Sequence, residues 1–441
     1  MAGLTYPEGA MTQTPQDPAA RRCVPVLVPS GQAGVAAVLP PLADALAGSG
    51  SAIAPLPTAG PDEYLMRLRR ALRPNDPVPG GVAAVLATSG STGDPAGVLL
   101  PAEALRAAAE GFAARFGQHR WVAALPLHHA GGFMVLVRSL VDGTVPVPVA
   151  SLGGAGPFTV EAFADATRAA LSGPGGDRPL AVSLVPAMLH LLDSAGDRGR
   201  AVLAEYDVVL VGGAAPPAPL VNALRDAGVS VITSYGMTET CGGIAFDGQP
   251  LPASRVRADD QGRLVACGAQ VAAGYRDGRQ PERWTVEDGL HCFRTDDLGE
   301  VDPQERVRVT GRVDDVVQVS GASVSLRAIA GRLRADAAVS DAEVVAVPDD
   351  RFGASIVAFV VAEDGAPGAP AADPRDGRDP NDSELGDLRI RLAARVADAL
   401  GRAARPWAVA LVDAIPMLES GKPDRARLQA QARVLLSRHD S

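Results

Sequence analysis

The chain has 441 residues, a formal net charge of −10, and 47% hydrophobic but only 4% aromatic side chains. This length exceeds what one ordinary hydrophobic core accommodates, so at least two domains are expected. The negative charge argues against a nucleic-acid-binding surface, and proline, glycine or charge interrupts every apolar run before the ~18 residues of a membrane span.

The four cysteines are scattered along the chain and form no Cys-x-x-Cys pair: Cys23, Cys241, Cys267 and Cys292. This spacing predicts neither a metal cluster nor a disulfide framework. The first 25 residues lack the continuous apolar run of a secretory signal. Both observations favour a cytoplasmic protein.

The first part of the chain predicts an α/β fold. Residues 1–22 are polar and proline-rich, which is typical of a mobile tail. Apolar runs then alternate with alanine-rich stretches, giving predicted strands over residues 82–87, 121–125, 181–185, 208–211 and 229–233 and predicted helices over 102–116 and 160–171. This alternation predicts parallel or mixed sheets covered by helices in a large N-terminal domain, residues 23–311.

The later part of the chain changes its texture twice. Short alternating strands and turns over residues 262–309 predict a β-rich end to the large domain. Helix-like residues 325–335 and 383–399 flank two strand-like runs and predict a small, mobile α+β C-terminal domain over residues 312–441. Residues 363–382 carry no large apolar side chain and are predicted to form a disordered insertion.

A segment rich in glycine and hydroxyl side chains follows the predicted strand 82–87. It consists of Thr88, Ser89, Gly90, Ser91, Thr92 and Gly93. Glycine allows the positive φ angles and the close backbone approach that wrap N–H groups around phosphate oxygens, and the hydroxyls add donors. A flexible surface loop is the alternative. A Walker A loop is excluded because no Gly-Lys-Ser/Thr follows at the required spacing.

Two further strand ends carry candidate ligand-binding residues. His128 and His129 follow a predicted strand, and ligands collect at the carboxyl ends of parallel strands; a structural role is the alternative. Arg138 follows in the next helix-like run, where a solvated helix face is the alternative. Gly213 and Ala214 form a turn after a later strand, which lets a flat ring such as adenine lie against the backbone.

The segment 234–240 combines side chains of complementary chemistry. Tyr235 offers an aromatic face, Gly236 a close approach, Thr238 a hydroxyl donor and Glu239 a carboxylate. A carboxylate beside a phosphate-facing hydroxyl is what Mg²⁺ bridging to ATP oxygens requires. The segment therefore predicts a site for Mg-ATP.

Three later segments add charged residues. Asp297 lies in a two-carboxylate turn over residues 295–299, where it accepts both ribose hydroxyls or forms a plain Asx-turn. Arg312 and Asp314 lie where the texture changes, either as an interdomain salt bridge or as a nucleotide-contacting arm and a hinge. Lys422 lies on a glycine-bounded loop near the C-terminus.

Together these segments resemble the adenylate-forming superfamily of acyl-CoA synthetases, luciferases and peptide-synthetase adenylation domains. The resemblance runs from about Val82 to Arg427, and its most specific motifs are residues 88–93, 235–239, 295–299, 311–315 and 421–422. It implies two steps: a carboxylate attacks the α-phosphorus of ATP to give an acyl-adenylate and pyrophosphate, and a thiol then displaces AMP. ATP, Mg²⁺ and coenzyme A are the implied cofactors and co-substrates.

The resemblance also implies roles at the phosphates and for the movement between the two steps. Residues 88–93 hold the β- and γ-phosphates, Thr238 and Glu239 position Mg²⁺, and Lys422 neutralises the charge that develops at the α-phosphate. Asp314 is the hinge of the small domain.

The implied roles at the nucleotide and at coenzyme A belong to other motif residues: Tyr235 stacks on adenine, Gly213 and Ala214 line its site, Asp297 binds the ribose, Arg312 approaches the nucleotide, and Ser320, Gly321 and Ala322 line the pantetheine channel.

Two positions depart from the family pattern. Ala96 stands where the phosphate loop usually carries lysine, and Gln318 where related chains often carry a basic residue. The missing positive charge at residue 96 predicts slower handling of pyrophosphate. It also motivates an alternative from another class, a non-catalytic nucleotide-binding paralogue.

Within the superfamily, the chain is similar to the compact o-succinylbenzoate–CoA ligases of menaquinone biosynthesis, on residues 128–132, 135–140 and 183–186. The implied acid carries two carboxylates; one is activated, His129 and Arg138 are candidates to bind the other, and Gly236 lines the acid. A ligase for another aryl or short-chain acid, including one that acylates a carrier-protein thiol, is the alternative. A dehydrogenase is excluded because no Gly-x-Gly-x-x-Gly turn follows the first strand. A homodimer is left open.

Overall fold

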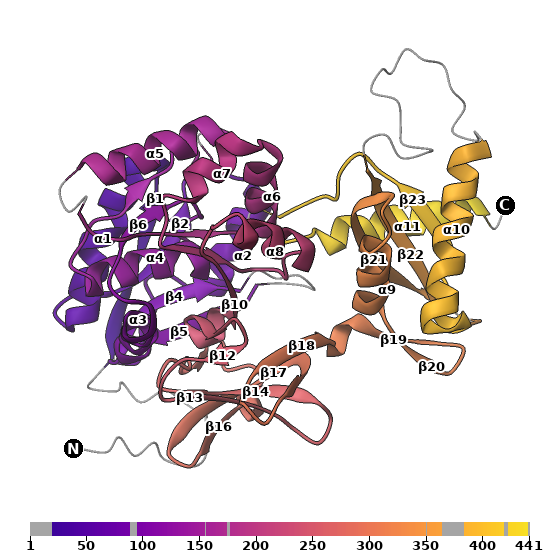
Figure 1. Ribbon diagram of the computed structural model, residues 1–441. Helices are drawn as coiled ribbons and strands as arrows, with labels where there is room; N and C mark the ends of the chain where they lie inside the picture. The colour runs from indigo at the N-terminus through magenta and orange to yellow at the C-terminus, as the bar shows by residue number, and fades with distance from the viewer. Residues whose placement is uncertain are drawn as a thin grey trace.

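The computed structural model describes residues 20–88, 95–154, 156–173, 177–349, 351–363, 383–418 and 422–439. Residues 89–93 of the predicted phosphate loop, residues 364–382 of the predicted insertion and the side chain of Asp314 lie outside this description. Figure 1 shows a large part built from the N-terminal two thirds of the chain, a β-rich unit next to it, and a smaller α+β part at the C-terminal end. The predicted α/β class with a β-rich end and a small α+β part is confirmed.

The first sheet has the strand order β15-β5-β4-β2-β1-β3. Its strands are β1 (Arg21–Val28), β2 (Ala52–Pro57), β3 (Pro77–Val78), β4 (Val82–Ala87), β5 (Gly97–Pro101) and β15 (Gly274–Tyr275), with helices α1 (Gly31–Ala47), α2 (Asp62–Leu72) and α3 (Ala102–Phe116). β4 and β5 form an antiparallel hairpin, so the predicted phosphate loop connects them. β1 begins inside the predicted tail 1–22, because Arg21 pairs with Val78 and its Nε donates to the Gly50 carbonyl at 2.6 Å.

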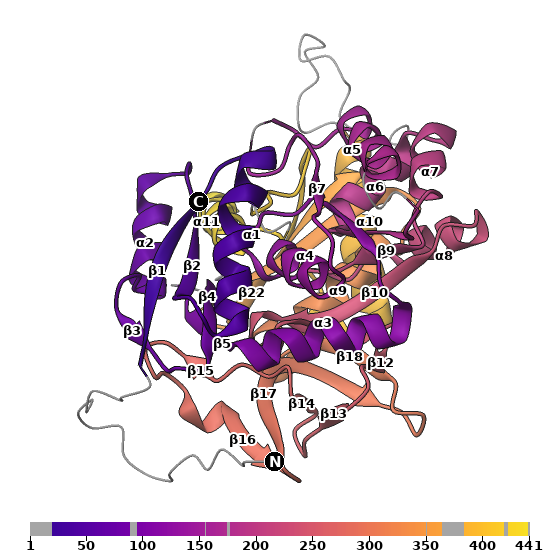
Figure 2. The same ribbon diagram turned by 90° about the vertical axis from the view of Figure 1, so that its left-hand side faces the viewer.

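The second sheet has the order β12-β11-β10-β9-β8-β6-β7. Its strands are β6 (Arg120–Ala123), β7 (Val147–Pro148), β8 (Leu180–Leu184), β9 (Val208–Val211), β10 (Val231–Met237), β11 (Gly242–Phe246) and β12 (Gln249–Pro250), with helices α4 (Ala130–Val141), α5 (Val160–Ser172), α6 (Pro186–Ser194), α7 (Asp197–Leu203) and α8 (Ala218–Asp226). Residues of α1, α3 and α4 share one hydrophobic core with strands of both sheets, and Figure 2 shows α1 and α4 between the sheets.

The β-rich unit consists of antiparallel strands: β13 (Ser254–Ala258), β14 (Arg263–Gly268), β16 (Trp284–Glu287), β17 (Leu290–Val301) and β18 (Val307–Arg312), with the short turn η2 (Pro281–Arg283). Cys267 of β14 and Cys292 of β17 lie opposite each other, with a Cα–Cα distance of 4.0 Å, and form a disulfide. The expectation that the cysteines form no disulfide was therefore wrong for this pair. Strand register brings the two residues together, and their separation of 25 residues gave no sign of it.

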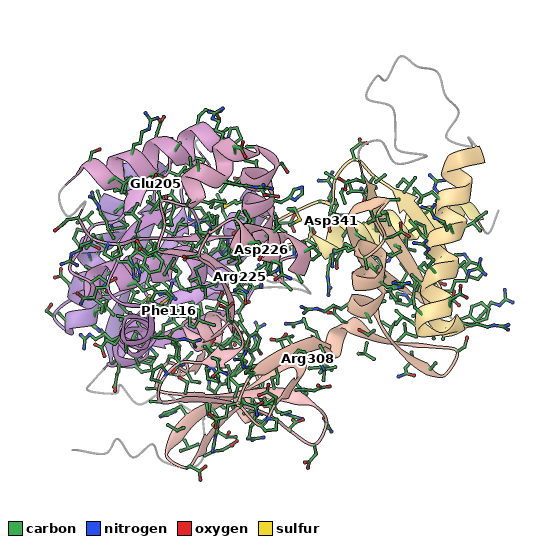
Figure 3. All side chains as sticks on the ribbon, viewed as in Figure 1. Phe116, Glu205, Arg225, Asp226, Arg308 and Asp341 are labelled. Carbon is green, nitrogen blue, oxygen red and sulfur yellow. A yellow bond between two sulfur atoms is a disulfide. The ribbon has the colours of Figure 1, made fainter. Side chains whose placement is uncertain are left out.

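The C-terminal part begins after β18. It contains η3 (Val313–Asp315), the hairpin β19 (Val316–Val319) and β20 (Ala322–Ser325), α9 (Leu326–Arg334), the sheet β21 (Val339–Asp349), β22 (Gly353–Ala362) and β23 (Ala408–Leu411), α10 (Ser383–Leu400), η4 (Arg402–Ala404) and α11 (Arg425–His439). Figure 3 shows side chains packed throughout both parts, with Arg225 and Asp226 of α8 near the small part in this view. No helix within the described ranges is long and apolar enough to cross a membrane.

Candidate active site

Several of the predicted motifs meet at one edge of the second sheet. β6, β8, β9 and β10 are parallel, so their carboxyl ends share this edge. The edge carries residues that follow or end three of these strands: His128 and His129 after β6, Gly213 and Ala214 after β9, and Tyr235 at the end of β10. Because β9 and β10 are neighbours, the Gly213 turn lies beside Tyr235. Parallel sheets collect ligands at this edge.

Asp297 connects this edge to the β-rich unit. Tyr235 Oη donates a hydrogen bond to Asp297 Oδ2 at 2.9 Å, and Arg312 Nη1 donates to Oδ1 at 3.1 Å. Residues 295–299 were expected to form a turn but lie within β17, where Asp297 pairs with Arg312 of β18. Burial raises the pKa of Asp297, while Arg312 and Tyr235 act against this rise. Three residues with implied nucleotide roles are thus in direct contact.

Glu239 joins the two large sheets. It is buried in the short turn η1 (Thr238–Thr240), directly after β10, and accepts a hydrogen bond from Tyr275 Oη at 2.7 Å. Tyr275 belongs to β15 of the first sheet, and Ala272 N just before it donates to the Glu239 backbone carbonyl at 2.9 Å. Burial raises the pKa of Glu239, and the Tyr275 hydrogen bond lowers it. A buried carboxylate of this kind gains from a neighbouring cation.

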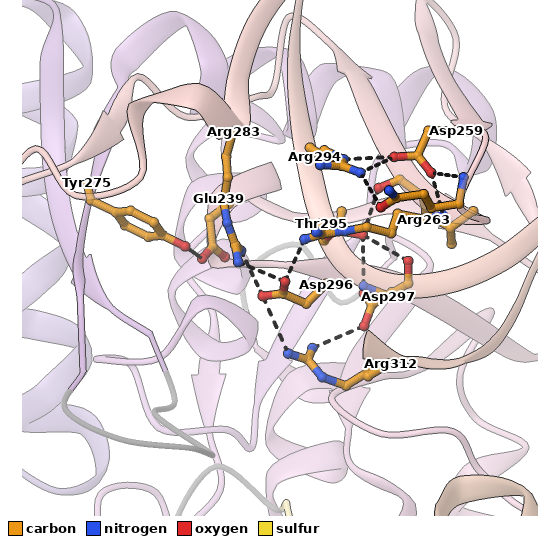
Figure 4. Close-up of polar contacts among 12 residues, drawn as sticks. Glu239, Asp259, Arg263, Tyr275, Arg283, Arg294, Thr295, Asp296, Asp297 and Arg312 are labelled. Carbon is orange, nitrogen blue, oxygen red and sulfur yellow. Dashed lines mark hydrogen bonds and ion pairs between the residues drawn. The ribbon is translucent and has the colours of Figure 1, made fainter. Parts of the chain in front are cut away.

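Asp296 gathers arginines beside this pair (Figure 4). Arg283 forms two hydrogen bonds with its carboxylate, both of 2.7 Å, and Arg263 forms another of 2.7 Å. Arg312 lies 3.9 Å from Asp296 Oδ2. Figure 4 shows the Arg283 guanidinium between Glu239 and Asp296, and its positive charge lowers the pKa of Glu239. Asp296 and Arg283 therefore lie between the Glu239 carboxylate and the Asp297–Arg312 pair.

Lys422 reaches these residues from the small domain. Burial and the charge of Arg312 lower the pKa of Lys422, and Glu239 and Asp297 act in the opposite direction. The Lys422 charge in turn lowers the pKa values of Glu239, Asp297 and His129. The lysine therefore lies within electrostatic reach of both ends of the site.

His129 is uncharged at neutral pH. Its pKa is lowered to about 3 by burial, by His128 and by Lys422. The centroids of the two imidazole rings are 4.3 Å apart. Its Nε2 has no hydrogen-bond partner among the described residues. His129 can therefore form a hydrogen bond with a ligand, but it offers no positive charge for a carboxylate.

The base of the predicted phosphate loop is closed by Thr88. Its backbone N donates to the Ala96 carbonyl at 2.8 Å, and Ala96 N donates to Thr88 Oγ1 at 3.0 Å. Ala96 is buried in the core shared by the two sheets. The residue that replaces the usual lysine is therefore part of the hydrophobic core, and residues 89–93 lie outside the described structure.

Glycine stands at the two motif positions 236 and 213 for different physical reasons. A Cβ at Gly236 would lie 1.8 Å from the Gly242 carbonyl oxygen of β11, so the close approach predicted there is made by the protein's own backbone. Gly213 has a φ of 83°, which favours glycine in its turn. Thr238 is half-buried at the start of η1, next to Glu239.

Arg138, predicted to bind the acid, lies on α4 and outside the group of residues described above. It is buried on α4, with its guanidinium carbon 4.6 Å from the ring centroid of Phe112 and 5.2 Å from that of Trp121. Arg138 follows the helix N-cap His129 by nine positions, a rise of roughly 13 Å. The described contacts of Arg138 are with these two aromatic rings, and its role at the acid stays a prediction.

The predicted pantetheine residues lie on the β19–β20 hairpin of the small domain. Ser320, Gly321 and Ala322 form the exposed turn of the β19–β20 hairpin, and Ser320 N donates to the Phe352 carbonyl at 2.8 Å. Figure 1 shows this hairpin pointing away from the large part. The backbone of Asp314 lies in η3, between β18 and the hairpin.

Sequence reasoning missed Tyr275 and Arg283 and gave Asp296 no separate role. The doubled carboxylate at 296–297 was the available signal for Asp296. Nothing in the spacing links residue 275 to residue 239, because their contact depends on how the two sheets pack.

Comparison with known proteins agrees with these features. The AMP-binding enzyme family matches residues 25–279, and the AMP-binding enzyme C-terminal domain matches residues 331–422. A probable 2-succinylbenzoate–CoA ligase of Mycobacterium tuberculosis is 36% identical over 404 residues, which cover 91% of this chain and 96% of the relative. A 2-succinylbenzoate–CoA ligase of Enterococcus faecalis is 30% identical over 64% of this chain and 60% of its own length.

Solved structures share the fold. The o-succinylbenzoate CoA synthetase of Bacillus subtilis, in complex with its acyl-adenylate intermediate, has a TM-score of 0.65 at 21% identity and covers 93% of this chain and 88% of its own. ATP-bound MatB of Rhodopseudomonas palustris has a TM-score of 0.70 at 19% identity, covering 93% and 89%. The family match extends over more than half of the chain. The chain therefore belongs to the AMP-binding enzymes, the adenylate-forming family that its motifs resemble.

Proposed function

We propose that this chain is an ATP-dependent acid–CoA ligase that converts o-succinylbenzoate, also called 2-succinylbenzoate, into its coenzyme A thioester through an acyl-adenylate. One observation carries the proposal. Lys422, from the C-terminal loop, lies within electrostatic reach of Glu239 and Asp297 of the large domain. A cation placed between the two ends of a nucleotide site is what adenylation requires. The relatives named 2-succinylbenzoate–CoA ligase support the choice of acid.

In the first half-reaction, a carboxylate oxygen of the acid attacks the α-phosphorus of ATP. A new O–P bond forms, and the bond to pyrophosphate breaks. Lys422 stabilises the charge that develops on the α-phosphate. Asp297 accepts hydrogen bonds from the ribose hydroxyls, beside Tyr235 and Arg312, each of which donates to one of its oxygens in this structure.

Glu239 and Thr238 are the residues that hold Mg²⁺ in this proposal. The buried Glu239 carboxylate has a raised pKa and offers a hard oxygen ligand in a polar setting. When bound, the metal neutralises charge on the phosphates. Tyr275 fixes the carboxylate through its hydrogen bond to Oε1.

In the second half-reaction, the thiol sulfur of coenzyme A attacks the acyl carbonyl carbon. A C–S bond forms, the C–O bond to AMP breaks, and the thiol proton leaves to solvent. Residues 320–322 line the pantetheine path in this proposal, which requires the small domain to turn about Asp314 because their hairpin points away here. Use of ATP and coenzyme A fits the predicted cytoplasmic location.

The acid is tested by AMP release from purified protein with Mg-ATP and coenzyme A. o-Succinylbenzoate is compared with benzoate, salicylate, succinate and short fatty acids. We expect activity with o-succinylbenzoate alone. Activity with another acid would keep the chemistry and replace the substrate, and the position of Arg138 makes this comparison important. ATP binding without turnover of any acid would favour the non-catalytic paralogue.

The role of Lys422 is tested by separating the half-reactions. In Lys422→Ala, we expect adenylate formation to be lost and thioester formation from pre-made acyl-adenylate to remain, because the lysine acts at the α-phosphate. Equal loss of both half-reactions would contradict this role.

A further inference from the structure

Arg425 connects three elements of the small domain through buried acids. It is the first residue of α11, three residues after Lys422. Its Nε and Nη2 donate to Glu343 Oε1 of β21 at 3.1 and 3.0 Å, and its Nη1 donates to Asp315 of η3. The Asp315 side chain is 2% exposed and the Glu343 side chain 8%. Buried carboxylates of this kind need a cation in a fixed position.

The same residue lies at the base of the Lys422 loop. The backbones of Met417 and Pro423 form an isolated β-bridge. Leu418 N donates to the Lys422 carbonyl at 2.7 Å, and Asp424 N donates to the Pro416 carbonyl at 2.7 Å. The backbone therefore closes the loop on itself, and the next side chain after this closure is that of Arg425.

Asp315 is the other end of the connection. It follows Asp314 in η3, at the point where the chain leaves β18 and enters the small domain. A rotation of the backbone at Asp314 carries Asp315 with the small domain. Since Arg425 holds Asp315, the base of the Lys422 loop is fixed relative to the first buried residue after the hinge.

We propose that Arg425 is a positioning residue for adenylation, which couples Lys422 rigidly to the hinge segment through Asp315 and Glu343. The proposal rests on the proposed function, in which Lys422 acts at the α-phosphate and the small domain turns at Asp314. Arg425 touches no reacting atom and acts through the position of Lys422. The planar guanidinium bridges two carboxylates from different elements, which a lysine ammonium at residue 425 cannot reproduce with the same geometry.

The test measures both half-reactions in Arg425→Lys and Arg425→Gln. Adenylation is followed by pyrophosphate exchange into ATP, and thioester formation from pre-made acyl-adenylate and coenzyme A. We expect adenylation to fall about tenfold or more, because small displacements of a catalytic group cost up to ~100-fold, and thioester formation to change less than about twofold. Arg427→Gln, an exposed arginine on the same helix turn, is the matched control and is expected to retain both rates.

A double variant separates positioning from general stability. If Arg425 acts through Lys422, Arg425→Lys adds little further loss of adenylation in a Lys422→Arg background, which keeps a positive charge and a measurable residual rate, so the two effects are not additive. Additive losses, or equal losses in both half-reactions of Arg425→Lys, would overturn the proposal. In case both arginine variants fail to fold, Glu343→Gln weakens the hold on Arg425 and leaves Asp315 paired. Arg334→Gln is its control, because Arg334 Nη2 donates to the other Glu343 oxygen at 3.2 Å. Wild-type protein that adenylates no acid would instead refute the proposed function.

Discussion

The hydrogen bond between Tyr275 and Glu239 can be tested by removing one oxygen atom. Tyr275→Phe keeps the ring, which packs edge-on against Trp284 with centroids 4.7 Å apart, and removes only the hydroxyl that donates to Glu239 Oε1 at 2.7 Å. Both side chains are buried, so water does not simply replace the hydroxyl. The variant therefore isolates the support that Glu239 receives from the first sheet.

The size of the effect follows from the kind of contact. A hydrogen bond to a charged group contributes roughly 1.5–3 kcal/mol, which corresponds to about 10- to 100-fold in a rate or binding constant. Because this bond lowers the pKa of Glu239 against the effect of burial, its loss raises the pKa of Glu239 further. We expect weaker use of Mg-ATP and an acid limb of the adenylation rate that moves to higher pH, since a larger fraction of Glu239 is protonated.

The assay is adenylation by pyrophosphate exchange, measured across pH and Mg²⁺ concentration. Tyr206→Phe is the matched control, because its buried hydroxyl lies 2.7 Å from Thr167 Oγ1 in the core of the second sheet, away from Glu239. Both variants are expected to lose stability, but only Tyr275→Phe shifts the pH profile. An unshifted acid limb in a folded Tyr275→Phe protein would refute the reasoning.

Three further predictions concern other parts of the molecule. The pKa of His129 is about 3 in the folded protein against its ordinary 6.5, so its contribution to stability is complete above pH 6.5 and is lost as pH falls. Urea unfolding should show a loss of at most about 2 kcal/mol between pH 7 and pH 5, and His129→Gln should abolish this loss. The same pH dependence of the unfolding free energy in His129→Gln would contradict the low pKa. Arg138→Met should leave the KM for the acid within about twofold, and a large rise in KM would support a role of Arg138 at the acid. The variant should lower the free energy of unfolding, because the buried Asp142 loses a positive neighbour. Thiol titration of unfolded protein should find two reactive cysteines without reductant and four with it, and four in both cases would exclude the Cys267–Cys292 disulfide.

The elements predicted best from the sequence are those that the residue pattern within one segment determines. The predicted strands 82–87 and 208–211 and the predicted helix 102–116 coincide with β4, β9 and α3. β10 was expected to end at residue 233 but continues to Met237, because its second half pairs with β11. Residues 295–299 were expected to turn but continue as a strand, because β18 lies beside them. Partner strands decide such cases, and a pattern within one segment does not reveal the partner.

The candidate site was predicted unevenly for a related reason. Residues within a single motif, such as Tyr235 and Glu239, could be proposed because glycine, hydroxyl and carboxylate side chains occur together along the chain. Tyr275 was missed because it reaches Glu239 only through the packing of two sheets. Arg138 was assigned to the acid because a second carboxylate needs a polar or cationic partner; along α4 it lies roughly 13 Å from His129, a separation that the motif by itself did not reveal.

The charges of the described site explain why the position of Lys422 should matter for adenylation. Three carboxylates lie together, those of Glu239, Asp296 and Asp297, and the three arginines that face them are Arg263, Arg283 and Arg312. These six side chains together carry no net charge, whereas ATP brings several negative charges. The phosphate loop adds no lysine, since residue 96 is a buried alanine. Lys422 brings positive charge to this group from the small domain, and Arg327 of α9 adds a second positive charge near Asp297. In such a site, charge stabilisation at the phosphates depends on the position of the small domain, so adenylation should be unusually sensitive to whatever holds Lys422 in place.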